Sequence, residues 1–187
     1  MNPAHEPSPT EVYRTLALGA LAFPFYRAYI HRLPLAGNER VLDFGAGAGV
    51  CTRHLAARLK RGGGRVTCVN ISPRWHEVIQ KNLSGFSNID YHLGDIEALN
   101  LPNRTYDAIL IHLVLHTIPP VERPRILAAL AHKLKPGGLW FVREPVERAE
   151  ITPEAIHDLL CGLGFTESSR AFSRHRLTGR LYEAVFQ

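Results

Sequence analysis

Cysteine is scarce in this sequence, and no two cysteines have the spacing of a metal or redox site. The three cysteines, at positions 51, 68 and 161, form no C-x-x-C motif and no even set for a disulfide framework. Two of them fall in expected core elements, which indicates buried, reduced thiols and a reducing compartment. We therefore expect neither a metal centre nor a disulfide-stabilised secreted domain.

Long hydrophobic runs and a basic leader are also missing. The uncharged run from Thr15 to Tyr26 is shorter than the roughly 18 apolar residues that a membrane-spanning helix needs. The first residues, M-N-P-A-H-E-P-S-P-T, lack the basic start of a secretory signal. We expect a cytoplasmic protein without a transmembrane segment. Its 187 residues suffice for one domain with a full core.

A strong excess of one charge is absent as well. The formal net charge of +5 permits an anionic partner without requiring one. Nucleic-acid-binding proteins usually concentrate their basic residues in a patch, so this modest excess alone does not indicate nucleic-acid binding.

The most informative stretch runs from Val41 to Val50. It begins with V-L-D-F, a short apolar run typical of a buried strand, and continues with three glycines at every second position. Glycines let the backbone approach a ligand closely, and a helix that begins there offers free N–H groups. Asp43 stands at the strand end, where open α/β sheets bind their ligands. The helix that follows has one apolar face, formed by Ala48, Cys51, Leu55 and Leu59.

This glycine pattern differs from that of dinucleotide-binding proteins, whose third glycine would stand at Val50. Here the pattern is Asp-x-Gly-x-Gly-x-Gly, and a carboxylate so close repels a pyrophosphate but attracts a cationic amino group. The pattern resembles the first motif of class I S-adenosylmethionine (SAM)-dependent methyltransferases. The resemblance implies SAM as cofactor, S-adenosylhomocysteine as product, and an Asp43 carboxylate that helps to hold the ammonium group of SAM. It also implies that the methionyl part of SAM passes beside Gly45, Ala46, Gly47 and Gly49.

The second strand, expected over residues 65–71, ends at Asn70 and leads into a helix capped by Ser72 with Pro73 at its first position. The family usually has Asp or Glu at position 70, where the side chain binds the ribose hydroxyls. An asparagine oxygen can still accept one such hydrogen bond. The alternative is that Asn70 caps the turn.

The third strand, expected over residues 89–93, is followed by a Gly-Asp pair that is common in the family. There the aspartate contacts the adenine amino group, which implies this role for Asp95; an ordinary turn residue is the alternative. The resemblance implies that the cofactor site at these strand ends also includes Ile71, Gly94, Ile96 and His112.

The resemblance is continuous from residue 38 to residue 145, and it includes the segment L-H-T-I and the segment L-K-P-G-G in the family's order. Helices are expected over residues 48–61, 73–83, 120–134 and 153–163. Strands are expected over 105–112 and 139–142, with a terminal pair over 166–172 and 180–187 joined by a basic turn of Arg174, His175 and Arg176. Periodicity and resemblance agree on an α/β fold. We predict a doubly wound, mostly parallel seven-stranded sheet with a C-terminal antiparallel hairpin.

Three side chains are candidates for catalysis: His112 and His116, near the expected position of the methyl group, and Glu144, just after the fifth strand. Either histidine could act as a general base, and Glu144 as a base or an anchor for a substrate amine. The i, i+4 spacing of the histidines could suggest a metal pair, but no third ligand follows at a known spacing. The plainer alternative is that His112 lines the cofactor site and His116 caps the turn. Five other histidines (His5, His54, His76, His132 and His157) are expected at the surface.

The N-terminal segment is expected to be frayed over residues 1–10 and helical over 11–33, with a break or kink at Pro24. We divide the chain into this helical cap or lid, residues 1–33, and a SAM-binding domain, residues 34–187. As a lid, the segment would bring Tyr13, Tyr26 and His31 to the substrate. The alternatives are a helix that packs on the domain, or an interfacial helix with arginines around an apolar body.

The expected substrate is a small or amphiphilic molecule, with a lipid-like substrate and peripheral membrane contact kept open. Enzymes that methylate exocyclic amines of nucleic-acid bases carry (Asp/Asn/Ser)-Pro-Pro-(Tyr/Phe) after the fourth strand, whereas this chain has I-H-L-V. No nucleic-acid partner is therefore expected, and the oligomeric state is left open. The alternatives are a catalytically silent SAM-binding subunit and a nicotinamide-dependent oxidoreductase. Val50 and the terminal hairpin argue against the oxidoreductase.

Overall fold

The structure of the chain is a computed structural model that describes residues 6–147, 151–175 and 179–187. It consists of two compact units, Met1–Leu99 and Asn100–Gln187. No helix within the described ranges is both long enough and apolar enough to cross a membrane.

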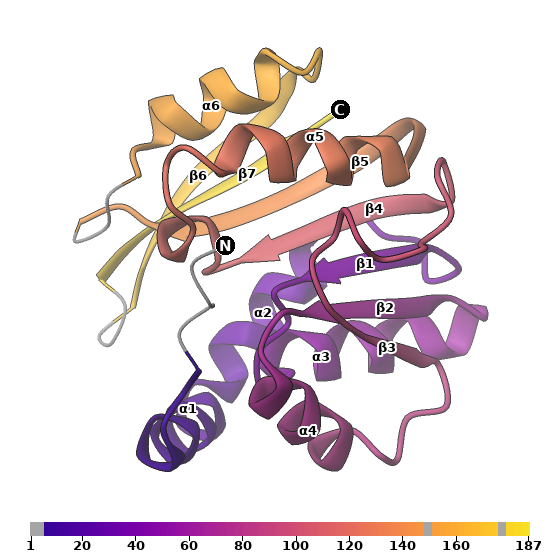
Figure 1. Cartoon of the computed structure of the whole chain (residues 1–187), viewed down its shortest axis with the longest axis vertical. Helices are drawn as coiled ribbons and strands as arrows, with labels where there is room; N and C mark the ends of the chain where they lie inside the picture. The colour runs from indigo at the N-terminus through magenta and orange to yellow at the C-terminus, as the bar shows by residue number, and fades with distance from the viewer. Residues whose placement is uncertain (1–5, 148–150, 176–178) are drawn as a thin grey trace. The chain divides into compact units, whose positions relative to one another are not determined.

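The first unit contains three parallel strands in the order β3-β2-β1: β1 (Arg40–Phe44), β2 (Arg65–Asn70) and β3 (Ile89–Leu93). Figure 1 shows them side by side. Their registers align Asp43 with Cys68, and Asn70 with Leu93. Because parallel strands end at one edge, the segments after Phe44, Asn70 and Leu93 emerge together. This edge carries the predicted cofactor contacts of this unit.

Three helical elements connect these strands: α3 (Val50–Leu59), the short 3-10 helix η1 (Lys60–Gly62) and α4 (Pro73–Asn82). The predicted apolar face of α3 is confirmed, since Ala48, Cys51, Leu55 and Leu59 are all buried. The predicted cap of α4 is confirmed as well. The Ser72 hydroxyl accepts a hydrogen bond from the Trp75 backbone N–H, which satisfies one of the free donors at the helix start.

The N-terminal segment forms two helices, α1 (Pro9–Leu21) and α2 (Phe23–Arg32), and the break lies at Ala22 rather than at Pro24. Pro24 sits in the first turn of α2, where a missing N–H removes no helical hydrogen bond. Fraying to residue 10 was also a wrong prediction, because Ser8 and Glu11 form a capping box that starts α1. Residues 1–5 lie outside the described residues.

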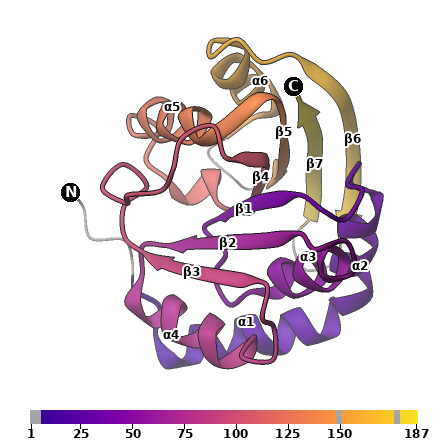
Figure 2. The same ribbon diagram turned by 90° about the vertical axis from the view of Figure 1, so that its right-hand side faces the viewer.

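In the described part of the second unit lie strands β4 to β7 and the helices α5 and α6. Strands β4 (Tyr106–His112) and β5 (Leu134–Pro145) are parallel, whereas β7 (Gly179–Phe186) is antiparallel to both β5 and β6 (Glu167–His175). The strand order is β4-β5-β7-β6, and Figure 2 shows β7 next to β6. The other elements are the short 3-10 helix η2 (Leu115–Thr117), α5 (Arg123–Lys133) and α6 (Pro153–Cys161). The predicted C-terminal antiparallel hairpin is therefore confirmed.

Strand β5 is much longer than the predicted 139–142. It takes in Lys135-Pro136-Gly137-Gly138, which follow the end of α5 at Lys133, and it extends past Glu144 to Pro145. The prediction that Glu144 follows the strand was therefore wrong: Glu144 lies inside β5, opposite Tyr182 of β7. Of the predicted basic turn, Arg174 and His175 belong to β6, and Arg176 lies outside the described residues.

Candidate cofactor and active site

The glycine turn after β1 depends on a left-handed backbone at all three of its glycines. Gly45, Gly47 and Gly49 have φ of 70°, 54° and 80°, which other residues rarely adopt. Glycine is required at position 49 for a second reason: a Cβ there would lie 2.7 Å from side-chain carbons of both Ile79 in α4 and Leu83, the residue after α4. At Gly47 the nearest atom to such a Cβ would be 3.9 Å away, so conformation rather than space requires glycine there.

Asn70 binds the backbone of this turn. Its side-chain oxygen accepts a hydrogen bond of 2.9 Å from the Gly47 N–H, and its amide group donates one of 3.4 Å to the Gly47 carbonyl. An aspartate could accept the first bond but could not donate the second. An asparagine in place of the family's acidic residue therefore allows both hydrogen bonds to the turn. These bonds match the alternative that Asn70 caps the turn.

Asp43 lies beneath the turn rather than on its surface. Its carboxylate is 2% exposed and accepts a 2.6 Å hydrogen bond from the Thr52 hydroxyl of α3. Burial raises the pKa of Asp43 from its usual 3.8 to about 6, and the Thr52 hydrogen bond offsets part of that rise. An ionised Asp43 is thus a buried negative charge that would be stabilised by a cation.

The ends of β2 and β3 combine an apolar surface with a carboxylate. Ile71 is 52% exposed, which is high for a large aliphatic side chain at a strand end. Asp95 is partly exposed, and its Oδ1 accepts a hydrogen bond from the Glu97 N–H. Gly94 has a φ of 144°, and Ile96 is buried, so these two shape the loop.

The N-terminal segment is attached next to this edge at two points. Glu6 accepts a hydrogen bond of 2.8 Å from the Arg74 N–H at the start of α4, and the Arg74 guanidinium donates to the Pro7 carbonyl. Further along, Gly19 of α1 packs against Val50, the first residue of α3, so closely that a Cβ would lie 2.7 Å from Val50 Cγ2. The segment therefore connects the starts of the two helices that follow β1 and β2.

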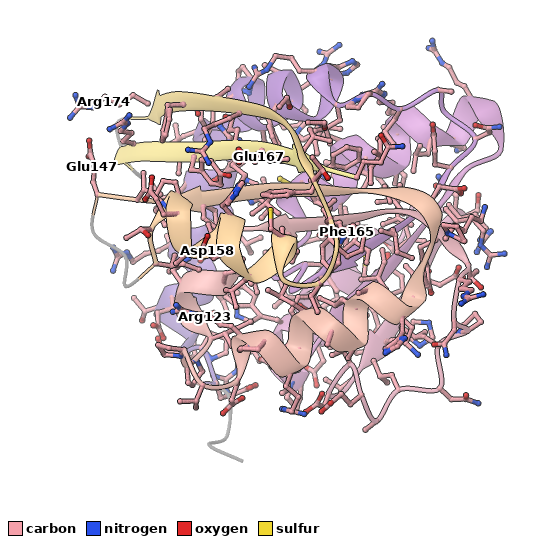
Figure 3. All side chains as sticks on the ribbon, turned by 90° about the horizontal axis from the view of Figure 1, so that it is seen from above. Arg123, Glu147, Asp158, Phe165, Glu167 and Arg174 are labelled. Atoms are coloured by element: carbon pink, nitrogen blue, oxygen red, sulfur yellow. The ribbon has the colours of Figure 1, made fainter. Side chains whose placement is uncertain are left out.

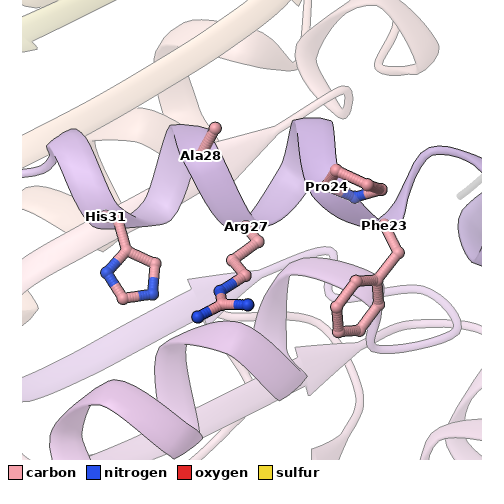
Figure 4. Close-up of a pocket in the computed structure, with 5 residues that line it drawn as sticks. All are labelled: Phe23, Pro24, Arg27, Ala28 and His31. Atoms are coloured by element: carbon pink, nitrogen blue, oxygen red, sulfur yellow. The ribbon is translucent and has the colours of Figure 1, made fainter.

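The predicted substrate residues of this segment, Tyr13, Tyr26 and His31, have different surroundings. Tyr13 is 72% exposed on α1, while Tyr26 stacks edge-on against Phe25 with ring centroids 5.9 Å apart. His31 borders a shallow hollow on α2 with four neighbours. Figure 4 shows Phe23, Arg27 and His31 on the same side of α2. The full lining is Phe23, Pro24, Arg27, Ala28 and His31.

His54 on α3 was expected at the surface, but that prediction was wrong. The residue is 6% exposed and its ring lies 4.3 Å from that of Phe23. Burial, assisted by Arg27 and Arg53, lowers the pKa of His54 to about 4, so its ring is neutral at pH 7.

In the second unit, the chain turns sharply after β4. Leu113 has a φ of 59°, a strained value for a leucine, and its N–H donates to the Arg143 carbonyl of β5. Directly before it, burial and the Arg143 charge lower the pKa of His112 to about 3. His112 is therefore neutral at pH 7 and a poor acceptor for a proton, which weakens the prediction that it acts as a general base.

Glu144 holds the segment after this turn. Its carboxylate is fully buried, and it accepts hydrogen bonds from the backbone N–H groups of Val114 (2.6 Å), Leu115 (2.8 Å) and His116 (3.4 Å). These groups start η2, so the carboxylate serves as an N-terminal cap supplied by a neighbouring strand. The sequence analysis did not identify Thr52, which binds Asp43, or Leu113, which forms the turn after β4, because neither residue carries a local sequence signal for its role.

The same carboxylate orients the His116 ring. His116 Nδ1 lies 2.7 Å from Glu144 Oε2, and the histidine side chain is 29% exposed. A carboxylate at Nδ1 fixes the proton there and leaves Nε2 as the acceptor. Of the three predicted catalytic residues, the structure joins His116 and Glu144 into a dyad and gives Glu144 an anchoring role rather than that of a free base.

A protein family described as "Methyltransferase domain" matches residues 41–138, which is more than half of the chain. Among curated proteins, the demethylmenaquinone methyltransferase of Tropheryma whipplei (strain Twist) is 36% identical over 63% of this chain and 46% of its own length. The ubiquinone biosynthesis O-methyltransferase of Methylocella silvestris is 42% identical over 58% of this chain and 40% of its own. The chain thus spans less than half the length of these relatives.

Solved structures agree on the fold. A SAM-dependent methyltransferase from Aquifex aeolicus has a TM-score of 0.79 at 16% identity, over 97% of this chain and 98% of its own. Human N-acetylserotonin methyltransferase in complex with SAM has a TM-score of 0.73 at 21% identity, over 94% of this chain and 55% of its own. These likenesses confirm the predicted fold class, a mostly parallel seven-stranded sheet with a C-terminal antiparallel pair.

Proposed function

Because this chain belongs to the methyltransferase-domain family and is a SAM-dependent methyltransferase, we propose that it methylates a hydroxyl group of a small, lipophilic aromatic molecule. The observation that carries the proposal is the dyad of His116 and buried Glu144, 2.7 Å apart. A general base is useful when the acceptor arrives protonated, as a phenol or quinol does. The names of two relatives, which refer to menaquinone and ubiquinone, point to the same class of acceptor.

The residues of the first unit fit SAM. The glycine turn provides an open backbone at Gly47, buried Asp43 would be stabilised by the ammonium group, and exposed Ile71 offers an apolar surface for adenine. Asp95 provides a carboxylate acceptor for the adenine amino group. When bound, SAM supplies an electrophilic methyl group on a sulfonium.

Residues of the second unit would remove the proton from the acceptor hydroxyl. The acceptor hydroxyl donates to His116 Nε2, which takes the proton as the oxygen becomes a better nucleophile. Glu144 then stabilises the imidazolium through Nδ1 and keeps the ring in place through the three backbone N–H groups. His112 stays neutral and contributes no proton.

The direct test is a methyl-transfer assay with purified protein, SAM and a panel of catechols and naphthoquinols. His116→Gln should lower turnover by about a hundredfold, the usual scale for loss of a general base. His132→Gln, an exposed histidine on α5, is the matched control and should leave turnover unchanged. Equal turnover of both variants would rule out the base. SAM binding without turnover of any acceptor would favour the silent-subunit alternative.

We also propose that α1 is a lid on the cofactor edge of the first unit, as the attachments at Arg74 and Val50 suggest. Gly19→Leu should push α1 away from α3, since a Cβ at 2.7 Å leaves no room. Turnover should fall by about tenfold while the melting temperature changes little, because positioning is lost rather than the core. Ala20→Leu, the exposed neighbour, is the control. Full activity of Gly19→Leu would show that α1 only packs.

The corner between α1 and α2 would give a lipophilic substrate access from a membrane surface. Leu21 is 78% exposed and Phe23 is 40% exposed, with the exposed side chains of Arg14, Arg27 and Arg32 on the same two helices. Exposed apolar side chains among arginines suit an anionic lipid surface. We propose peripheral contact there, which a vesicle co-sedimentation assay would detect.

A further inference from the structure

A second cluster of reactive side chains lies in the second unit, and the methyltransferase mechanism does not use it. Cys161, the last residue of α6, has its Sγ 3.5 Å from His157 Nε2. His157 Nδ1 in turn lies 2.8 Å from Glu167 Oε2 on β6. Figure 3 shows the two elements, with Asp158 labelled on α6 and Glu167 on β6. The order thiol, imidazole, carboxylate is that of an activated nucleophile.

The carboxylate of this cluster remains ionised and is firmly held. Arg170 donates two hydrogen bonds of 2.7 Å to Glu167, and the Tyr182 hydroxyl donates a third of 2.9 Å. These partners, Arg170 first, lower the pKa of Glu167 to about 2. The ionised Glu167 therefore accepts a hydrogen bond from the Nδ1–H group of His157, and Nε2 is left to face the thiol.

Access and chemistry distinguish Cys161 from the other two cysteines. Cys51 and Cys68 are 6% and 1% exposed, and burial raises the pKa of the Cys68 thiol. Cys161 is only half-buried, and the side chain of its partner His157 is 40% exposed. A small reagent can therefore reach Cys161 from solvent, and a base is in place to receive its proton.

We propose that Cys161 is a nucleophilic thiol, activated by His157 and Glu167, that forms a mixed disulfide with small-molecule disulfides such as glutathione disulfide. The thiol proton passes to His157 Nε2, and Cys161 Sγ attacks one sulfur of the disulfide. The new S–S bond forms as the old one breaks, and the departing thiolate takes the proton from His157. One disulfide is consumed and one is formed, so no other oxidant is required.

Such a modification would also disturb the local structure. A bulky adduct at Cys161 removes the contact with His157, and His157 is one of three residues that share Glu167. Arg170 of β6 and Tyr182 of β7 also bind Glu167, so the His157 contact joins α6 to this hairpin. Its loss is expected to loosen the packing of α6 on the hairpin. The melting temperature of the glutathione adduct should therefore be lower than that of the reduced protein.

The test measures the rate at which native protein reacts with the disulfide reagent 5,5′-dithiobis(2-nitrobenzoate) and with glutathione disulfide. One thiol should react quickly, peptide mapping should identify it as Cys161, and Cys161→Ser should abolish that phase. His157→Gln should slow it by about tenfold or more, and Glu167→Gln should also slow it. Asp158→Asn, an exposed neighbour on α6, is the control and should have no effect.

A second measurement compares the three cysteines within the wild-type protein, so it does not depend on whether the variants fold. In wild-type protein, Cys161 should react faster when native than after unfolding in urea, whereas buried Cys51 and Cys68 should react faster after unfolding. The proposal is overturned if Cys161 is no faster in the native state, if the rapid thiol is another cysteine, or if folded His157→Gln reacts at the wild-type rate.

Discussion

Replacing Glu144 by alanine is expected to abolish measurable methyl transfer and to destabilise the protein by roughly 3–5 kcal/mol, the scale for removing one partner of a buried charged network. The carboxylate is fully buried and accepts from three backbone N–H groups and the His116 ring. Alanine leaves the buried Leu115 N–H and the partly buried Val114 and His116 donors without this acceptor, next to the strained backbone of Leu113. Urea denaturation and the methyl-transfer assay measure the two effects.

Glu144→Gln separates the two roles of this side chain. Its remaining oxygen can still accept hydrogen bonds from Val114 and Leu115, so most of the stability should be kept, but its NH₂ group cannot accept the hydrogen bond from His116 Nδ1–H. Turnover should fall about a thousandfold as the ring loses its tautomer and orientation. Asp158→Asn, an exposed carboxylate, is the control. Near-normal turnover of Glu144→Gln would contradict the dyad.

Asp43→Asn should have effects of opposite sign on stability and on cofactor binding. Because burial raises the folded-state pKa of Asp43 from 3.8 to about 6, the folded state binds its proton more tightly than the unfolded state. The destabilisation therefore develops as the pH rises from 3.8 to 6 and is complete above that range. Above pH 6, ionised Asp43 costs roughly 3 kcal/mol, and the asparagine variant should be more stable by up to this amount.

Urea denaturation at pH 4 and at pH 7.5 measures the stability effect, since the advantage of Asp43→Asn should nearly vanish at pH 4. Calorimetry should show weaker SAM binding to the variant by roughly 1–3 kcal/mol, because the ammonium group loses an anion. In the wild type, SAM affinity should rise as Asp43 ionises toward neutral pH. Thr52→Val, which removes the hydrogen bond to Asp43, should lower stability at pH 7.5. A less stable Asp43→Asn protein at that pH would refute the desolvation argument.

Much of the fold was predictable because its signals are local. Short apolar runs predicted β1, β2, β3 and β4 nearly to the residue, and the turn with its three glycines follows β1 as expected. Ser72 before Pro73 gave the start of α4. Each of these depends on a few consecutive residues, so periodicity and capping rules are sufficient.

Prediction was limited at residues whose structure depends on partners far away in the sequence. The helix before Lys135-Pro136-Gly137-Gly138 ends at Lys133 as expected, but β5 begins earlier than predicted because Leu134 already pairs with Tyr106 of β4. The partner of the Asn70 amide could not be predicted either, because it is the backbone of Gly47, 23 residues earlier in the chain. His54 appeared to be a surface residue until α2 packed against α3. None of these partners can be read from a short window of sequence.

The distance along the chain between Glu144 and the turn it caps has a consequence for the order of folding. The three N–H groups precede their acceptor by 28 to 30 residues, with all of α5 between them. The turn after β4 therefore cannot acquire its final form from local interactions, and it must wait until β5 has docked beside β4. During synthesis, the dyad of His116 and Glu144 is completed only after the ribosome has released the whole β4-α5-β5 segment.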